Sequence, residues 1–516
     1  MDLPRVNDMD ALQATEGAVA PSTTTLKRRL QGRHIAMIAI GGSIGTGLFV
    51  ASGASVAQAG PGGAIAAYVV IGLMVYFVVT GLGEMAALMP VSGSFAVYGE
   101  QYVDAGFGVA LGWTYWYSWA VTIAIELVAA QIVMRYWFPG VPGVWWGAGF
   151  LVLIFLLNTL SVRGFGESEY WFSLIKVVTV VAFIAAGLLI AAGLLGNGHA
   201  VGWRNFTTGD APFVGGVHAM MGVALIAGFS FLGTELVGIT AGESEHPRKT
   251  IPRAVKQIFW RIMLFYVLAI FVIGLLIPYT DPKLLKSDVT DIGVSPFTLV
   301  FSHAGFPLAA GAMNLVILTA VLSAGNSGTY AATRMLYTLA SEGRAPAAMF
   351  ATLSPGGVPR NALYATMAVG GLCFLTSLAD NQRIYLWLLN TVGITGFIAW
   401  LGIAVCHYRF RKGFLKQGYR LEQLPYRAKW FPFGPLFAIA VCLAISLGQD
   451  HQAFFAEKID WMEVLSIYVW IPLFVAIWWG YRRVCKSRLV RYEDMEIGPW
   501  LNRSVAAVDA AAGTKR

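Results

Sequence analysis

Length, composition and charge restrict the class of protein at once. The 516 residues are 57% hydrophobic and 12% charged, with a mean hydropathy of +0.64, whereas a soluble chain averages about 25% charged residues. So little charge cannot cover the hydrated surfaces of the several domains into which a soluble chain of this length would divide, and a soluble multidomain protein is excluded. The composition predicts a helical protein that crosses a membrane many times.

Twelve apolar stretches follow one another along the chain. A bilayer core of about 30 Å needs roughly 20 apolar residues in a helix, and continuously apolar stretches indicate helices, because barrel strands alternate. The stretches cover residues 35–54, 64–88, 109–133, 144–159, 170–194, 217–241, 260–277, 308–332, 362–378, 385–406, 433–448 and 464–480. The prediction is an all-α polytopic membrane protein, with a transporter domain of twelve transmembrane helices over 35–480 between tails at 1–34 and 481–516.

The distribution of positive charge predicts the orientation of these helices. If the N-terminus lies inside the cell, most of the 36 Lys and Arg residues fall in cytoplasmic tails and loops. The outer loops then hold Arg135, Arg204, Lys283, Lys286, Arg383 and Lys458. Because Lys and Arg accumulate on the cytoplasmic side of membrane proteins, both termini are expected in the cytoplasm. The net charge of +8 therefore reflects topology, and nucleic-acid binding is not expected.

The first stretch contains a glycine-rich interruption. Gly41, Gly42, Gly45 and Gly47 fall within seven residues, and each costs a helix about 1 kcal/mol relative to alanine. The sixth stretch is interrupted in the same way over residues 228–236. Interruptions in the first helix of each five-helix half are typical of an inverted-repeat transporter. The alternative is that these glycines only permit close packing between helices.

Two such interruptions side by side would form a receptor for a zwitterion. Unwound backbone is tolerated at membrane depth only where it lines a cavity or contacts protein. Its free N–H groups suit a carboxylate and its free carbonyls suit an ammonium group, the two charges of an amino acid. Residues 41–45 also match the G-x-S-x-G pattern of a hydrolase nucleophile, but that pattern requires a strand before it. Neither an enzyme nor a cofactor or metal site is therefore expected.

Three ionisable residues fall inside the predicted helices: Glu126, Lys176 and Glu235. Such residues are expensive to insert, at about 2.5–3.5 kcal/mol each, and indicate function by default. Glu235 follows the second interruption. It is either a partner for a cation or a proton, or a structural carboxylate that accepts hydrogen bonds from backbone donors. Lys176 lies near the start of the fifth helix. Either it has a functional role, or its long side chain extends to the cytoplasmic interface of the membrane. Glu243, two turns after Glu235, is expected near the cytoplasmic end in contact with water.

Two helices carry polar or aromatic faces. Tyr115, Trp119, Thr122 and Glu126 recur at helical spacing on the third helix. Aromatic rings can hold an ammonium group by cation–π contact, although these rings can also belong to an interfacial aromatic belt. The corresponding face of the eighth helix carries Ser323, Asn326, Tyr330 and Thr333. That face suits a substrate path or hydrogen bonding between helices equally well.

The interruptions, together with several longer motifs, resemble the amino acid–polyamine–cation superfamily from about residue 26 to residue 495. The motifs are MIAIGGSIGTGLFVASG (37–53), MPVSGSFAVYG (89–99), SVRGFGESEYWFSLIKV (161–177), TELVGITAGESE (234–245), VSPFTLVF (294–301), LSAGNSGTYAATRMLYTLA (322–340) and GVPRNALYAT (357–366). The stretches 161–177, 357–366 and 386–404 resemble the bacterial lysine permeases of that superfamily more narrowly.

The resemblance implies twelve helices in a five-plus-five inverted repeat with helices one and six broken. It also implies import of L-lysine with protons by alternating access, across the bacterial cytoplasmic membrane. The expected partners are lysine, protons and membrane lipid, and a regulatory protein partner stays open. The predicted substrate-binding residues are Ser43, Ile44, Gly45, Thr46, Gly47, Tyr115, Trp119, Phe229, Ser230, Phe231, Glu235 and Asn326. The predicted proton-coupling residues are Lys176, Glu235 and Glu243, where Lys176 resembles a fifth-helix lysine that replaces a sodium ion in proton-coupled relatives.

Two positions depart from the pattern of the lysine permeases. Leu232 and Glu126 stand where a polar amide and an aspartate are expected. Selectivity for lysine over arginine or ornithine therefore stays open. The alternatives to a lysine permease are a permease for other cationic or aromatic amino acids and a membrane protein that senses lysine.

Overall fold

The computed structural model describes residues 30–49, 51–159, 162–196, 199–285, 295–305, 307–377, 381–448 and 461–502. The α-helices in these ranges are α1 (Gly32–Gly41), α2 (Thr46–Phe49), α3 (Ser52–Leu88), α4 (Ser94–Tyr102), α5 (Ala105–Trp137), α6 (Gly143–Thr159), α7 (Val162–Ala191), α8 (Gly216–Phe231), α9 (Leu236–Thr240), α10 (Pro247–Arg261), α11 (Leu268–Leu276), α12 (Pro282–Leu285), α13 (Pro296–His303), α14 (Pro307–Ser341), α15 (Ala347–Phe350), α16 (Arg360–Gly370), α17 (Asn381–Lys416), α18 (Phe433–Gly448), α19 (Trp461–Tyr468) and α20 (Trp470–Val484).

Long apolar helices confirm the prediction of a polytopic helical membrane protein. Six segments of the described chain are long and apolar enough to cross a membrane: Ser52–Leu88, Ala105–Trp137, Gly164–Ala191, Gly216–Glu243, Gly311–Ser341 and Trp387–Lys416. Shorter apolar helices cover Gly143–Thr159, Leu264–Leu276 and Phe433–Gly448. The other three predicted stretches are helical in separate pieces, as α1 with α2, α16 with a 3₁₀ turn (Gly371–Ser377), and α19 with α20.

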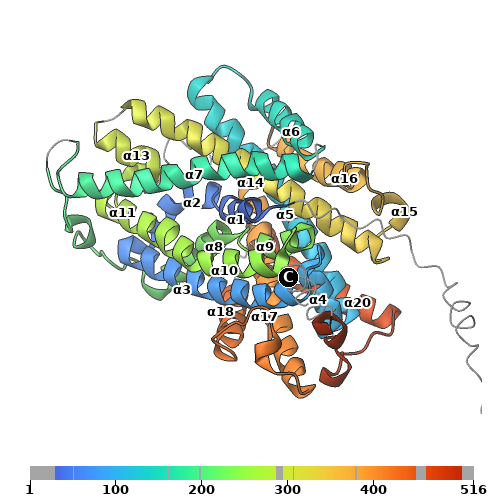
Figure 1. The fold of residues 1–516 in the computed structure, drawn as a ribbon. Coiled ribbons are helices and arrows are strands. Elements are labelled where there is room, and N and C mark those ends of the chain that lie inside the picture. Colours follow the sequence, from blue (N-terminus) through green and yellow to red (C-terminus); the bar gives the residue numbers. More distant parts are fainter. Residues whose placement is uncertain are drawn as a thin grey trace, which may run out of the picture.

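The two interrupted segments lie near the centre of the molecule. Figure 1 shows α1 and α2 between α7 and α14 on one side and α8, α9 and α10 on the other. In the packing, α1 contacts α7, α9 and α14, while α2 contacts α8. The helix α8 in turn packs along α3, and α14 packs along α5. Residues from both interruptions are therefore surrounded by long helices rather than by solvent.

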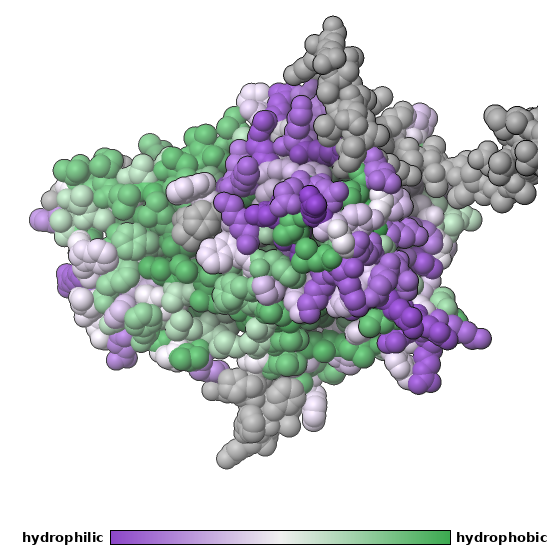
Figure 2. Space-filling view, turned by 60° about the horizontal axis from the view of Figure 1, so that its bottom comes forward, coloured by the Kyte–Doolittle hydropathy of each residue, from purple (hydrophilic) through white to green (hydrophobic). Residues whose placement is uncertain are grey.

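The surface divides into an apolar part and a polar end. Figure 2 shows hydrophilic residues gathered toward one end of the molecule, next to a broad hydrophobic area on the same face. On α7, exposed apolar side chains recur at Trp171, Ile175, Val178 and Val181. This spacing places them on one face of the helix. A large exposed apolar surface is what a protein surrounded by lipid requires.

Candidate functional site

The break in the first helix is held open by two side chains from other helices. After α1 ends at Gly41, the chain turns through residues 42–45 before α2 begins. The ammonium group of Lys176, on α7, donates a hydrogen bond to the Gly41 carbonyl at 2.5 Å. The Tyr266 hydroxyl donates to the Ser43 carbonyl at 2.8 Å. The Gly41 carbonyl also accepts from the Ile44 N–H at 3.3 Å, and the two side-chain donors stabilise both carbonyls in the interior.

The break in the second interrupted segment is in direct contact with the break in the first helix. The helix α8 ends at Phe231, and α9 begins at Leu236. Between them, Gly233 has a φ of +99°, which favours glycine. A methyl group at Gly233 would lie 2.4 Å from the Gly42 carbonyl oxygen. A glycine at this position is therefore required both by the backbone conformation and by the close approach of the two breaks.

A small cavity lies where the breaks meet α5 and α14. Its lining residues are Gly42, Ser43, Gly45, Gly47, Trp119, Thr122, Glu126, Phe229, Leu232 and Ala324. The cavity measures about 20 Å³, which is room for about one water molecule and not for an amino acid. Its position at the paired breaks marks it as the candidate site, in a conformation closed around it. Among the described residues, no cluster of His, Cys, Asp and Glu could hold a metal ion.

The predicted face of the third helix is found on α5, and part of it lines the cavity. Trp119, Thr122 and Glu126 reach the cavity, whereas Tyr115 lies one turn before Trp119 and contacts Glu235 instead. The Trp119 ring lies over Gly328 of α14, where a methyl group would come within 2.7 Å of it. The glycine on α14 thus leaves room for the tryptophan ring beside the site.

Glu126 is buried, and its two carboxylate oxygens differ in their environment. One, Oε1, accepts a hydrogen bond from the Thr46 hydroxyl at 3.1 Å. The other, Oε2, is buried and has no hydrogen-bond donor among the described residues. A buried polar atom without a partner is costly. Glu126 therefore brings an incompletely satisfied carboxylate to the wall of the cavity.

Glu235 is bound by donors on both oxygens. Tyr115 donates to Oε1 at 3.0 Å, and the indole of Trp400, on α17, donates to Oε2 at 3.1 Å. The backbone N–H of Gly233 contributes a further bond at 3.1 Å. Of the two readings that the sequence allows, these contacts match the structural carboxylate at the broken helix. Glu235 is not among the residues that line the cavity.

Lys176 is fully buried, so the reading in which it extends to the interface is wrong. Its charge interacts with two buried carboxylates, Glu169 on the same helix and Glu126 on α5. Glu169 accepts hydrogen bonds from Ser323 at 2.5 Å and from Asn326 at 3.2 Å. The predicted site residue Asn326 thus lies behind the cavity, where it holds Glu169.

Glu169 was not predicted from the sequence as a site residue. The predicted apolar stretch begins at residue 170, whereas α7 begins at Val162. Glu169 lies seven residues before Lys176, two helical turns away on the same face. A carboxylate and a lysine at this spacing are the signal that could have revealed it.

Three more predicted substrate residues have mixed placements. Phe229 lines the cavity. Ser230 instead lies next to the Tyr68 hydroxyl at 3.1 Å, and Phe231 packs on the Tyr266 ring at 4.2 Å between centroids. Ser230 also lies against Gly47, where a methyl group would come within 2.5 Å of its Cα atom. Ser230 and Phe231 therefore position the two breaks and are not among the residues that line the cavity.

Glu243 is buried, and the expectation of a water-exposed carboxylate is wrong. It forms an ion pair with Arg334 of α14 at 2.8 Å. The Arg334 guanidinium lies over the Tyr330 ring at 4.2 Å, and that ring stacks on Phe165 of α7. This arrangement joins the segment after α9 to α14 and α7.

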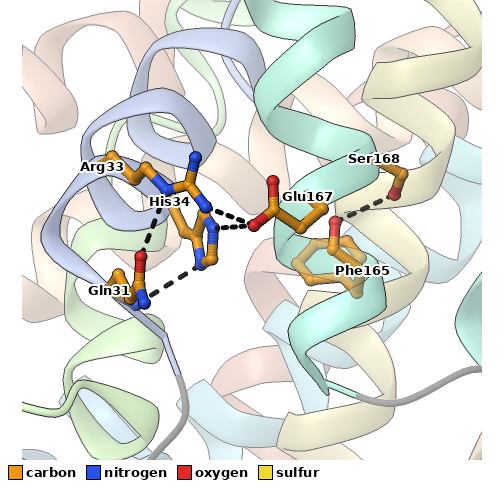
Figure 3. A network of polar contacts seen from close by, with 6 residues as sticks. All are labelled: Gln31, Arg33, His34, Phe165, Glu167 and Ser168. Atoms are coloured by element: carbon orange, nitrogen blue, oxygen red, sulfur yellow. Dashed lines mark hydrogen bonds and ion pairs between the residues drawn. The ribbon is translucent and has the colours of Figure 1, made fainter.

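The first turn of α1 is bound to the start of α7, as Figure 3 shows. Arg33 forms an ion pair with Glu167, and the His34 ring lies 3.2 Å from the same carboxylate oxygen. Just before α1, the Leu30 N–H donates to the Glu243 carbonyl at 3.0 Å. The end of α1 that lies away from the cavity is therefore held against both α7 and the segment after α9.

Comparison with known proteins defines the class. The model of the amino acid permease family matches residues 34–492, and the chain belongs to that family. Members transport amino acids across membranes and do not catalyse chemical reactions, which agrees with the prediction that this protein is not an enzyme.

Individual relatives cover nearly the whole chain. The lysine-specific permease LysP of Escherichia coli is 65% identical over 91% of this chain and 96% of its own length. The histidine permease HisP of Lactococcus lactis is 50% identical, over 92% of this chain and 98% of its own. The lysine-specific permease LysP of Lactococcus lactis is 48% identical, over 92% and 93%. The resemblance to the amino acid–polyamine–cation superfamily is thus confirmed.

Proposed function

We propose that this chain is a secondary active transporter that imports L-lysine by alternating access. The observation that carries the proposal is the cavity at the contact between two broken helices. Family membership and the 65% identity to a lysine-specific permease support the choice of substrate.

The backbone of the two breaks suits the groups that all amino acids share. The backbone N–H groups of the first break, near Gly45 and Gly47, suit the α-carboxylate, and the backbone carbonyls of the second break, near Leu232, suit the α-ammonium group. Trp119 offers an aromatic wall for the side chain. Phe231, Ser230 and Glu235 act in this proposal through position, because each is held in contacts behind the cavity.

The membrane arrangement is proposed with the function. The chain forms twelve transmembrane helices over 35–480 in a five-plus-five inverted repeat, with the tails 1–34 and 481–516 in the cytoplasm of a bacterial cell. The placement of Lys and Arg in the predicted inner loops supports this orientation. The two breaks, in the first and sixth predicted helices, support the repeat.

Lys176 is proposed as the proton-coupling residue. Its ammonium group bonds the Gly41 carbonyl at the end of α1, so its charge favours contact between α1 and α7. Loss of its proton would weaken this contact and allow α1 to move away, which opens the site toward the cytoplasm. Glu235 and Glu243 contribute by holding the sixth-helix segment, since both are already bound by neighbouring donors.

Reconstitution in liposomes tests the function. Labelled lysine uptake is measured with the membrane potential clamped and a pH gradient imposed, because a potential of 100 mV alone is worth about 2.3 kcal/mol for a cation. We expect saturable lysine uptake that increases with an inward proton gradient. Uptake that ignores the pH gradient at fixed potential would remove proton coupling. The absence of lysine uptake would remove the function itself.

A competition panel separates lysine from other substrates. One relative is a histidine permease at 50% identity, so histidine, arginine, ornithine and the aromatic amino acids are included as competitors. We expect lysine to compete most strongly with the labelled lysine.

A further inference from the structure

The buried charges next to the cavity do not balance. Glu169, Lys176 and Glu126 are all buried, and they carry two negative charges and one positive charge when ionised. Taking an unbalanced charge out of water is expensive. The cluster therefore needs one more positive charge to be neutral.

The hydrogen bonds show which carboxylate is left without compensation. Glu169 is bound on both oxygens, by Ser323 and by Asn326, and it lies on the same helix as Lys176, with whose charge it interacts. Glu126 receives a hydrogen bond from Thr46 on one oxygen, and its Oε2 has no donor among the described residues. Glu126 is therefore the carboxylate with an uncompensated oxygen, and we assign the unbalanced charge to it.

The protein groups around Glu126 do not supply the missing positive charge, so it must come from within the cavity. The charged groups that face it from the described helices are Lys176 and, beyond it, Glu169, both on α7. The other cavity walls near it present an alanine from α14 and apolar side chains from the second break, namely Ala324, Phe229 and Leu232. A compensating charge can come only from a proton or from an occupant of the site.

We propose that Glu126 selects substrates with a net positive charge by exchanging a proton for the substrate's charge. With the site empty or filled by a neutral amino acid, the carboxylate holds a proton. When a cationic amino acid enters, the carboxylate is ionised and its proton passes to water. The proton returns from the same side when the empty site faces that side again, so Glu126 itself carries no net proton across the membrane and coupling remains with Lys176. The inference rests on the proposed function, because it concerns the same site.

Lysine and norleucine make a matched pair for the test, because norleucine has the same carbon chain without the terminal ammonium group. Unlabelled lysine and norleucine are each used as competitors, and inhibition of labelled lysine uptake by the reconstituted full-length protein is measured at several pH values. For the wild type, we expect norleucine to bind about 100-fold more weakly than lysine, as expected for a lost charge pair. This ratio should fall as the pH is lowered, by up to about tenfold per pH unit, because lysine must displace the proton from Glu126 whereas norleucine binds with the proton in place.

Three variants isolate the carboxylate. Glu126→Gln should bind lysine about 100-fold more weakly and norleucine about as well as the wild type does, which brings the ratio close to one at every pH, since its side chain is neutral. Glu126→Asp keeps the charge and should retain the preference for lysine. Glu235→Gln serves as the matched control, because it removes a buried carboxylate that does not face the cavity, so the ratio should stay while uptake falls.

Each outcome decides a separate point. A folded Glu126→Gln protein with the wild-type ratio overturns the inference and leaves lysine transport in place. If that variant does not fold, the wild type decides, because a norleucine ratio that does not change with pH overturns the inference as well. A wild type that transports neutral amino acids but no lysine overturns both this inference and the proposed function.

Discussion

The Lys176 ammonium group donates a hydrogen bond to the Gly41 carbonyl at 2.5 Å and so joins α7 to the broken end of α1. A free carbonyl at the end of a helix normally binds water or a capping group. Here the donor is a charged side chain buried in the protein. The contact therefore depends on whether Lys176 carries a proton, which links the charge of one residue to the position of a helix.

Replacing Lys176 should separate exchange from accumulation. Lys176→Gln keeps a donor for the Gly41 carbonyl but has no charge to lose. We expect lysine-for-lysine exchange to continue while accumulation driven by a proton gradient falls by about tenfold or more, the scale of a 1.4 kcal/mol loss. Counterflow and gradient-driven uptake are measured on the same proteoliposomes. Full gradient-driven accumulation by the variant would exclude Lys176 from coupling.

Gly233→Ala should disrupt the contact between the two breaks. The added methyl group lies 2.4 Å from the Gly42 carbonyl oxygen, and alanine does not readily adopt a φ of +99°. Such a conformation costs about 1–3 kcal/mol for residues other than glycine. We expect a lower melting temperature and no transport. Gly149→Ala is the control, because nothing lies within 4 Å of its added methyl group on α6. Equal behaviour of the two variants would contradict the close approach.

The buried ion pair of Glu243 and Arg334 should show strong coupling in a double-mutant cycle. Removing one partner leaves the other charge buried, at a cost of about 3–5 kcal/mol. We therefore expect Glu243→Gln and Arg334→Met each to lower thermal stability more than the double variant does. Melting of the purified protein in detergent measures the effect. Additive losses would show that the two side chains do not interact.

Glu167→Gln should loosen the start of α1. The substitution removes the ion pair with Arg33 and weakens the contact with His34 (Figure 3). Hydrogen exchange of residues 32–41 should become faster by about tenfold, which corresponds to about 1.4 kcal/mol of local stability. Ser168→Ala is the matched control, because the Ser168 hydroxyl bonds only the Phe165 carbonyl of its own helix among the contacts drawn. Unchanged exchange in the Glu167 variant would contradict the role of this carboxylate.

The elements and the breaks could be predicted from local sequence, but their partners could not. Glycine spacing in residues 41–47 predicts an interruption because helix propensity is a local property. The contact between Gly233 and Gly42 joins segments far apart in the chain, so no local pattern contains it. The same holds for Trp400, whose bond to Glu235 explains why that carboxylate is satisfied. Glu126 was recognised from its depth in a helix, whereas its unpaired oxygen is visible only from the packing.

Competition against labelled lysine uptake in proteoliposomes tests the central claim most directly. The twenty amino acids, ornithine and cadaverine each compete with labelled lysine at a fixed potential and pH. The account predicts saturable uptake that lysine inhibits most strongly, with norleucine and other neutral amino acids far weaker. Strongest inhibition by an aromatic or neutral amino acid, or uptake that lysine does not saturate, would contradict it.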